Sequence, residues 1–152
     1  MSFRITGLPA ENFDHLFALS DAELRERGAM RKSAPGAVPC RISLTDATPG
    51  AEVILTNYEH LPVDSPYRMR FAVYVRKGEK TYDQVDEVPE QLRKRTLAAR
   101  SFDKDGMMID RELVEGTALE GTIERLLGEP SAAYLHLHYA APGCYAARVD
   151  RA

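Results

Sequence analysis

The 152-residue sequence lacks the features that mark exported and membrane-spanning proteins. It contains no run of about 18 apolar residues, which argues against a membrane-spanning helix. The N-terminal segment MSFRITGLPAENF lacks both the basic start and the apolar core of a secretory signal. We therefore expect a cytoplasmic protein with no membrane partner.

Cysteine and clustered positive charge are also scarce. The two cysteines, Cys40 and Cys144, are too few for a disulfide framework and should remain thiols in a reducing cytosol. Lys and Arg number 20 against 23 Asp and Glu, which gives a net charge of −3, and the longest basic run is Arg93-Lys94-Arg95. Because a nucleic-acid-binding protein usually carries a concentrated basic stripe, we expect no nucleic-acid partner.

Length and hydrophobic pattern predict a single α+β domain over residues 1–152. A chain of about 150 residues can bury a sufficient core without disulfides or a bound metal, so folding requires no cofactor. Pro and Gly fall at intervals that separate elements, and no long linker is present. We expect a mainly antiparallel sheet of about seven strands with two or three helices on one face or end.

The clearest helix signals are capping patterns. Ser20 and Glu23 are spaced as a capping box, which predicts that an N-terminal helical segment breaks and restarts there. Thr117 and Glu120 repeat the pattern before an apolar stripe typical of a helix packed on a sheet. A third, short helix is expected after Pro89.

Strands are expected where apolar and polar residues alternate. Residues 29–38 have a loop-like composition. The expected strands are residues 3–8, a hairpin of residues 40–44 with 52–60, residues 69–78, a hairpin around Asp105-Gly106, and a terminal hairpin over residues 133–151. The expected core comprises Phe13, Leu16, Phe17, Leu24, Leu44, Val53, Leu55, Phe71, Val73, Val75, Ile123 and Leu127.

Four segments together resemble a known family. They are CR-x-SL at residues 40–44, Y-x-H at residues 58–60, SPYR at residues 65–68 and GCYA-x-R at residues 143–148. In this order they resemble the bacterial family catalogued as domain of unknown function 1203, and the likeness extends over residues 3–151. The resemblance implies a small single-domain bacterial protein. It brings no catalytic residue to this sequence.

The histidines of the terminal hairpin are the candidates for a metal site. His136 and His138 are two apart on an expected strand, so their rings should point to the same face. His60, at the end of another expected strand, is a candidate third ligand. Alternation places the same pair on any half-polar strand, however, so hydrogen-bonded structural histidines are the favoured interpretation. We therefore assign no metal or cofactor.

Cys144 is the candidate nucleophile, because it follows Pro-Gly at the mouth of the terminal hairpin. His138 should face Tyr145 across the ladder and point away from Cys144, so a Cys–His pair would require His60. No Asn or Asp is placed to orient such a pair. Cys40, on the apolar side of its expected strand, is interpreted as a small buried hydrophobe.

The SPYR segment is the candidate anion-binding loop. Tyr67 offers an aromatic face, and the guanidinium of Arg68 can grip a carboxylate or phosphate. The alternative, which we favour, is that Tyr67 caps the core while Arg68 forms an ion pair with Asp64 or Glu59.

Two classes of function remain open. The favoured one is a binding module for a small anionic ligand or a protein partner. The alternative is a small enzyme, a metal- or Cys/His-dependent hydrolase or transferase. The candidate ligand-binding residues are Tyr58, His60, Tyr67, Arg68 and His136, and the candidate catalytic residues are His60, His138 and Cys144.

Overall fold

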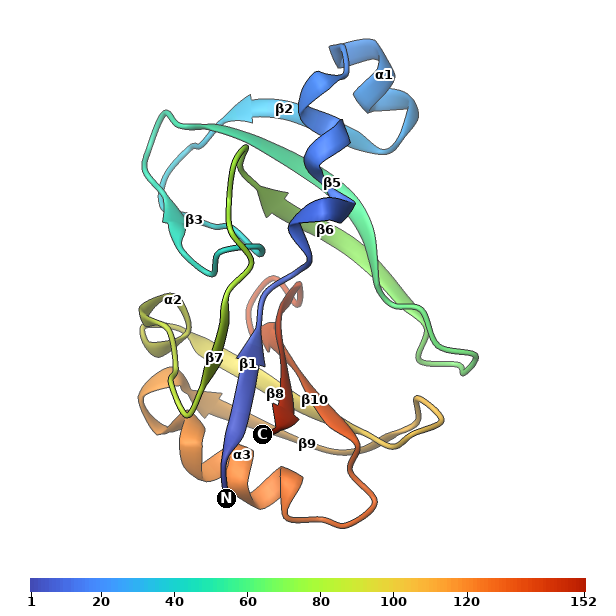
Figure 1. Cartoon of the computed structure of the whole chain (residues 1–152), viewed down its shortest axis with the longest axis vertical. Coiled ribbons are helices and arrows are strands. Elements are labelled where there is room, and N and C mark those ends of the chain that lie inside the picture. Colours follow the sequence, from blue (N-terminus) through green and yellow to red (C-terminus); the bar gives the residue numbers. More distant parts are fainter.

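The computed structural model describes residues 1–152 and contains three antiparallel sheets and three α-helices (Figure 1). The elements are β1 (Phe3–Thr6), α1 (Asp21–Glu26), β2 (Ala29–Ser33), β3 (Val38–Pro39), β4 (Asp46–Ala47), β5 (Glu52–Leu61), β6 (Met69–Val75), β7 (Asp83–Val85), α2 (Glu90–Arg93), β8 (Thr96–Phe102), β9 (Met108–Glu115), α3 (Leu119–Leu127), β10 (Tyr134–Tyr139) and β11 (Tyr145–Arg151). The six-stranded sheet has the order β7-β1-β11-β10-β8-β9, and the smaller sheets are β2-β5-β6 and β3-β4. This confirms the expected α+β class.

The six-stranded sheet packs against α3, the orange helix along the bottom of Figure 1. Leu119, Ile123 and Leu126 recur on one side of α3 because their spacing matches the helical period, and all three are buried. They belong to the same core cluster as Leu135 and Leu137 of β10. Burying each such side chain contributes roughly 1.5–3 kcal/mol, so this cluster fixes one face of the large sheet.

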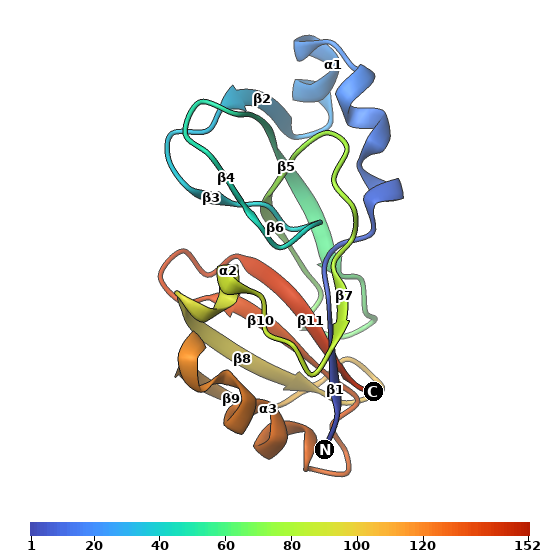
Figure 2. The same ribbon diagram turned by 60° about the vertical axis from the view of Figure 1, so that its left-hand side comes forward.

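The three-stranded sheet packs against the N-terminal helical turns, as the upper half of Figure 2 shows. Ile54 and Val73 point from this sheet toward Leu24 of α1 and belong with it to a second core cluster. The predicted capping box is confirmed, since Ser20 accepts from the Glu23 backbone and Glu23 accepts from the Ser20 backbone. Helix α1 therefore begins where the sequence indicates.

The strand expected at residues 40–44 is wrong. The segment forms a turn in which Leu44 has a φ of 53°, and only Cys40 makes a bridge, to Tyr74. Its alternating apolar side chains belong to three separate core clusters. Cys40 packs beside β3 and β4, Ile42 packs in the cluster of the three-stranded sheet, and Leu44 packs in the cluster of the six-stranded sheet. The alternation of apolar and polar residues in this segment therefore arises from its position between three core clusters and not from a β-strand.

The loop expected at residues 29–38 is also wrong, because β2 lies within it and pairs with β5. The hairpin predicted between residues 40–44 and 52–60 is therefore absent, and β5 instead pairs with β2 and β6. The β2 sequence, AMRKS, is polar because β2 is an edge strand with little buried surface.

Two smaller expectations also fail. Thr117 does not cap α3, because it lies in a 3-10 turn over Gly116–Ala118, and Glu120 pairs with Arg93 instead. Phe71, expected in the core, is 45% exposed, and Leu55 and Phe17 are only partly buried. Phe71 and Leu55 face an opening between the sheets. The apolar residues that the strand pattern predicts to be buried therefore line the wall of a cleft at these two positions.

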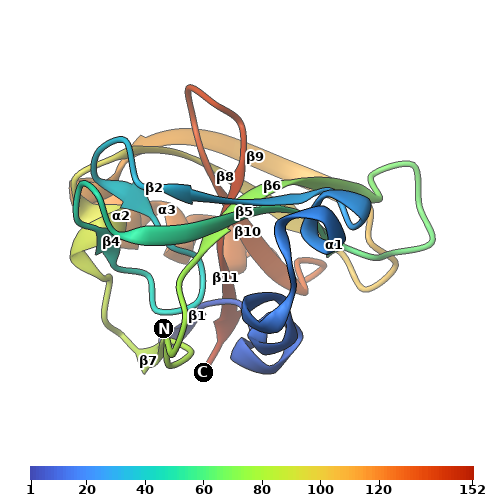
Figure 3. The ribbon, with the colours of Figure 1, turned by 90° about the horizontal axis from the view of Figure 1, so that it is seen from above.

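The two larger sheets meet at the terminal hairpin. Figure 3, seen from above, shows the three-stranded sheet lying across β10 and β11. Tyr145, the first residue of β11, packs into the core cluster of the three-stranded sheet. The structure contains no helix that is both long and apolar enough to cross a membrane.

Candidate anion-binding cleft

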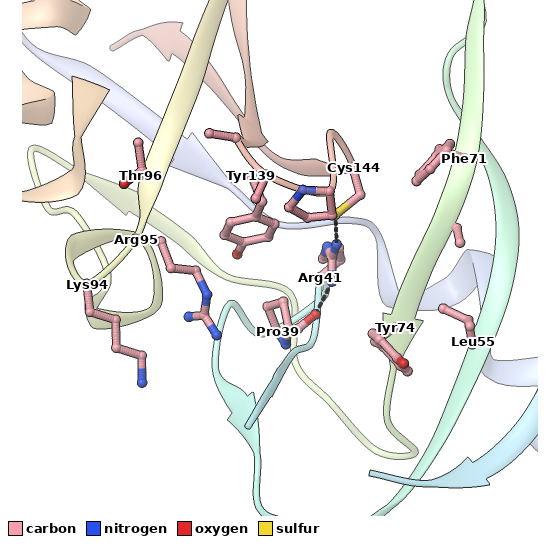
Figure 4. Close-up of a pocket in the computed structure, with 14 residues that line it drawn as sticks. Pro39, Arg41, Leu55, Phe71, Tyr74, Lys94, Arg95, Thr96, Tyr139 and Cys144 are labelled. Atoms are coloured by element: carbon pink, nitrogen blue, oxygen red, sulfur yellow. Dashed lines mark hydrogen bonds between the residues drawn. The ribbon is translucent and has the colours of Figure 1, made fainter. Parts of the chain in front are cut away.

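A cleft of about 600 Å³ opens where the two sheets diverge (Figure 4). This volume falls within the range of pockets that hold small organic ligands. One wall is the β5–β6 ladder, the opposite wall is the β10–β11 turn, and the start of β8 closes one end. The lining residues are Pro39, Arg41, Leu55, Phe71, Ala72, Tyr74, Lys94, Arg95, Thr96, Tyr139, Ala140, Ala141, Pro142 and Cys144.

Arg41 forms the floor of the cleft and is only 2% exposed. Its Nε donates to the Tyr145 carbonyl at 2.8 Å, its Nη1 donates to the Pro39 carbonyl, and its Nη2 donates to Cys144 Sγ at 2.9 Å. Figure 4 shows the last two contacts as dashed lines. No carboxylate lies within ion-pair distance of Arg41, so a buried guanidinium has no negative partner in the protein.

Lys94 and Arg95 add positive charge at the end of the cleft. Both pair with Asp46, at 2.8 and 3.0 Å. Burial alone would raise the pKa of Asp46, but the hydrogen bonds from Lys94 and Arg95 outweigh it and lower the pKa. No Asp or Glu lines the cleft itself, and Asp46 pairs with Lys94 and Arg95 but not with Arg41.

Tyr139 anchors the arginines. The guanidinium carbons of Arg41 and Arg95 lie 4.9 and 5.3 Å from the centre of its ring, within the range of cation–π attraction. Its hydroxyl donates to Gln91 Oε1 at 2.5 Å. Burial raises the pKa of the Tyr139 phenol, so the group stays protonated and keeps this hydrogen bond. The cations are therefore positioned before any ligand arrives.

A second polar cluster lies on the other side of Tyr145. His60 from β5 stacks on the Tyr145 ring at a centroid distance of 4.9 Å and lies 5.4 and 6.1 Å from the rings of His138 and His136. All three histidines are at most 8% exposed. His138 faces Tyr145 across the ladder, as the register of β10 with β11 shows. We call His60, His136 and His138 the histidine cluster.

The histidine cluster is uncharged at neutral pH. Burial lowers the pKa of His60 to about 4 and that of His138 to about 3, and it lowers the pKa of His136 well below the usual value. His138 Nδ1 lies 2.9 Å from the Gly143 carbonyl and Nε2 lies 3.5 Å from Arg100 Nη1, which fits a neutral ring protonated at Nδ1. His60 has no hydrogen-bond partner at either nitrogen, nor does His136 at Nδ1.

The histidine cluster is not arranged as a metal centre. No three His, Cys, Asp or Glu side chains in the structure converge in a geometry that could hold a metal ion. Arg100 lies against His138 Nε2, the nitrogen that a metal would need. Burial and the adjacent cation therefore both oppose a second positive charge at this point.

The remaining sequence candidates are dispersed. The Tyr58 hydroxyl accepts from Asn12 and its ring packs on Phe13, while Tyr67 packs edge-on against Phe102. Arg68 is exposed and donates twice to Glu59, at 3.0 and 3.1 Å, which is the ion pair that the alternative interpretation predicts. The structure thus brings His60 to the terminal hairpin but places the Arg68 head group in an exposed pair.

Sequence reasoning missed the cations of the cleft. Arg41 follows Cys40 in the CR-x-SL segment, and Lys94 and Arg95 belong to the longest basic run, which we weighed only as evidence on nucleic acid. Tyr139 reads as an ordinary strand aromatic. The sequence offered two separate signals, an arginine shortly after Pro39 and the basic run that contains Lys94 and Arg95, but it did not show that the fold brings them together.

Fold and cleft together define an α+β protein with a cation-floored pocket between two antiparallel sheets. The chain belongs to the family described as "Protein of unknown function (DUF1203)", whose model matches residues 37–151. This match is shorter than the likeness over residues 3–151 that the sequence indicated. Every residue that lines the cleft lies inside the matched range. No curated protein and no solved structure matches the chain.

Proposed function

We propose that this protein is a binding module for a small organic anion, held in the cleft with its carboxylate or phosphate at Arg41. The observation that carries the proposal is a guanidinium that is 2% exposed, opens on a cleft of about 600 Å³ and has no carboxylate partner. We place the protein in the bacterial cytoplasm, where its two cysteines, free in the structure, would remain thiols.

Charge favours an anion over a neutral ligand. A charge removed from water is costly unless it is paired with an opposite charge. Arg41 donates its three hydrogen bonds to two backbone carbonyls, which are uncharged, and to a cysteine sulfur, which is a weak acceptor. A guanidinium has five N–H donors, so donors remain for an oxygen anion. Arginine binds carboxylate and phosphate with two parallel hydrogen bonds, which adds orientation to attraction.

Shape favours an anion with an apolar body. Phe71 and Tyr74 present aromatic surface on one wall (Figure 4). Pro142, in the β10–β11 turn, adds apolar surface to the lining. Phe71 is 45% exposed, although its strand pattern predicts burial. A flat apolar group lying between these walls would cover Phe71 and leave its charged end at the Arg41 floor.

The binding interpretation is preferred to the enzyme alternative because of what the cleft contains. Cys144 is its only nucleophilic thiol, and no histidine lines it. The histidine cluster is closed off and makes no hydrogen bond to Cys144. An acid–base pair with an accessible reaction centre, which hydrolysis or group transfer requires, is therefore not assembled in the cleft.

Thermal unfolding in the presence of defined anions tests the proposal. We expect benzoate or phenyl phosphate to raise the melting temperature saturably, by an amount equal to about 2.7 kcal/mol when the ligand is 100-fold above its Kd. Benzyl alcohol, which has the ring but no charge, should have no such effect. Inorganic phosphate at equal ionic strength reports the contribution of the charge alone.

Matched variants locate the site. Arg95→Gln removes one cleft cation and should weaken the response, whereas Arg68→Gln removes an exposed arginine outside the cleft and should leave it unchanged. The proposal fails if no carboxylate or phosphate in a panel of aromatic and aliphatic compounds stabilises the protein saturably. It also fails if Arg68→Gln abolishes the response, since the SPYR loop would then be the site.

A further inference from the structure

Cys144 and Cys40 have opposite surroundings. Cys144 lines the cleft, is 8% exposed and accepts a hydrogen bond at Sγ from Arg41 Nη2. Cys40 is fully buried beside β3, its Sγ lies 3.9 Å from the Val38 carbonyl, and burial raises the pKa of its thiol to about 11. One chain therefore holds a thiol that contacts both a cation and an open cavity, and a second thiol that serves as its internal control.

We propose that Cys144 is an oxidation site, at which a hydroperoxide entering the cleft converts the thiol to a sulfenic acid with Arg41 as the positioning residue. Nothing in this proposal depends on the organic anion. It rests on two independent observations: a thiol at the wall of a cavity, and a buried guanidinium with no carboxylate partner that donates to its sulfur.

The oxidation step needs only the peroxide. The sulfur of Cys144, having given up its proton, attacks one peroxide oxygen, and the S–O bond forms as the O–O bond breaks. The other oxygen leaves as hydroxide, or as alkoxide from an organic peroxide, and takes up a proton to give water or an alcohol. Sulfur is oxidised by two electrons and the peroxide is reduced by two.

Arg41 assists this step through charge and geometry. A guanidinium that donates to sulfur stabilises the negative charge that sulfur carries when it attacks. The contacts of Arg41 to the Tyr145 and Pro39 carbonyls hold it in place, so it does not have to move to assist. Cys40 is sealed from the cleft, and Arg41 donates to the other sulfur. Burial outweighs the nearby charges of Arg76 and Arg41 and raises the pKa of the Cys40 thiol to about 11.

Peroxide oxidation trapped with dimedone, followed by mass spectrometry of the two cysteine peptides, tests the proposal. The urea-unfolded chain supplies the reference rate for each thiol without its surroundings. We expect native Cys144 to be labelled about tenfold faster than unfolded Cys144, and native Cys40 to be labelled more slowly than unfolded Cys40. The proposal is overturned if folding slows the labelling of Cys144.

Variants test the role of Arg41. Arg41→Lys keeps the charge but loses the fork that contacts sulfur and both carbonyls, so Cys144 should be labelled several-fold more slowly. Arg111→Gln, an exposed arginine on β9, is the matched control and should not change the rate. Equal rates in Arg41→Lys and wild type would refute the positioning role. If Arg41→Lys does not fold, the native and unfolded rates in the wild-type chain still decide whether Cys144 is activated.

Discussion

The cleft and the histidine cluster are neighbours with opposite properties. The cleft is open and collects Arg41, Lys94 and Arg95, whereas the histidine cluster is buried and its rings are neutral. The cluster brings three histidines together, yet burial lowers their pKa values and keeps them neutral. The cleft, in contrast, offers open space and, at Arg41, a charge with no carboxylate partner. A candidate site is therefore better located by accessible volume and unpaired charge than by titratable residues alone.

Tyr145 separates the two regions and contacts both. Its ring stacks on His60 and lies edge-on to His136, with centroid distances of 4.9 Å in each case. Its carbonyl accepts from Arg41 Nε at 2.8 Å. The side chain thus supports the histidine cluster while the backbone supports the floor of the cleft, which lets substitutions separate the two roles.

Truncation of Tyr145 should have the largest effect. We expect Tyr145→Ala to lower the free energy of unfolding by about 3–5 kcal/mol, because it removes a buried aromatic ring and leaves a cavity beside three histidines. Tyr145→Phe keeps the ring and should cost less than about 1 kcal/mol, since the hydroxyl makes no hydrogen bond to the protein. Urea unfolding measures both. A cost below 1 kcal/mol for the alanine variant would mean that the ring does not support the cluster.

Local patterns predicted most of the fold. The capping box at Ser20, the hairpin around Asp105-Gly106 and the terminal hairpin all appear as expected, because each depends on contacts between residues close in sequence. The segment at residues 40–44 was wrongly predicted to be a strand. Its apolar residues alternate because they pack into three different core clusters formed by distant parts of the chain. Periodicity reports which side chains are buried, but not what buries them.

The candidate site was less accessible to sequence reasoning. His60 lies beside His138, as a candidate third ligand would have to, but the cleft is assembled from five segments that are far apart in the chain. Arg41 belongs to the CR-x-SL segment, and nothing in the neighbouring sequence shows that its guanidinium lacks a carboxylate partner. Unpaired charge is a property of the folded neighbourhood, so only a structure reveals it.

Acid should destabilise the protein through the histidine cluster. The folded pKa of His60 is lowered to about 4, so below the unfolded value near 6.5 the unfolded chain binds protons that the folded one excludes. The contribution of the histidine cluster to stability should be constant above that value and fall as pH drops, by up to about 1.4 kcal/mol per pH unit for each such histidine. His60→Phe should reduce this slope between pH 6.5 and 5, whereas His15→Gln, an exposed control, should not. Identical slopes in all three proteins would contradict the neutral cluster.

Divalent metal should have the smallest effect. We expect Zn²⁺ or Ni²⁺ at stoichiometric concentration to leave the melting temperature unchanged, because Arg100 lies against His138 Nε2 and no carboxylate offsets the added charge. Elemental analysis of purified protein gives a second readout. A metal that copurifies, raises the melting temperature and is lost in His136→Ala would reverse the comparison. The histidine cluster would then be the functional centre, and the metal-dependent enzyme the better interpretation.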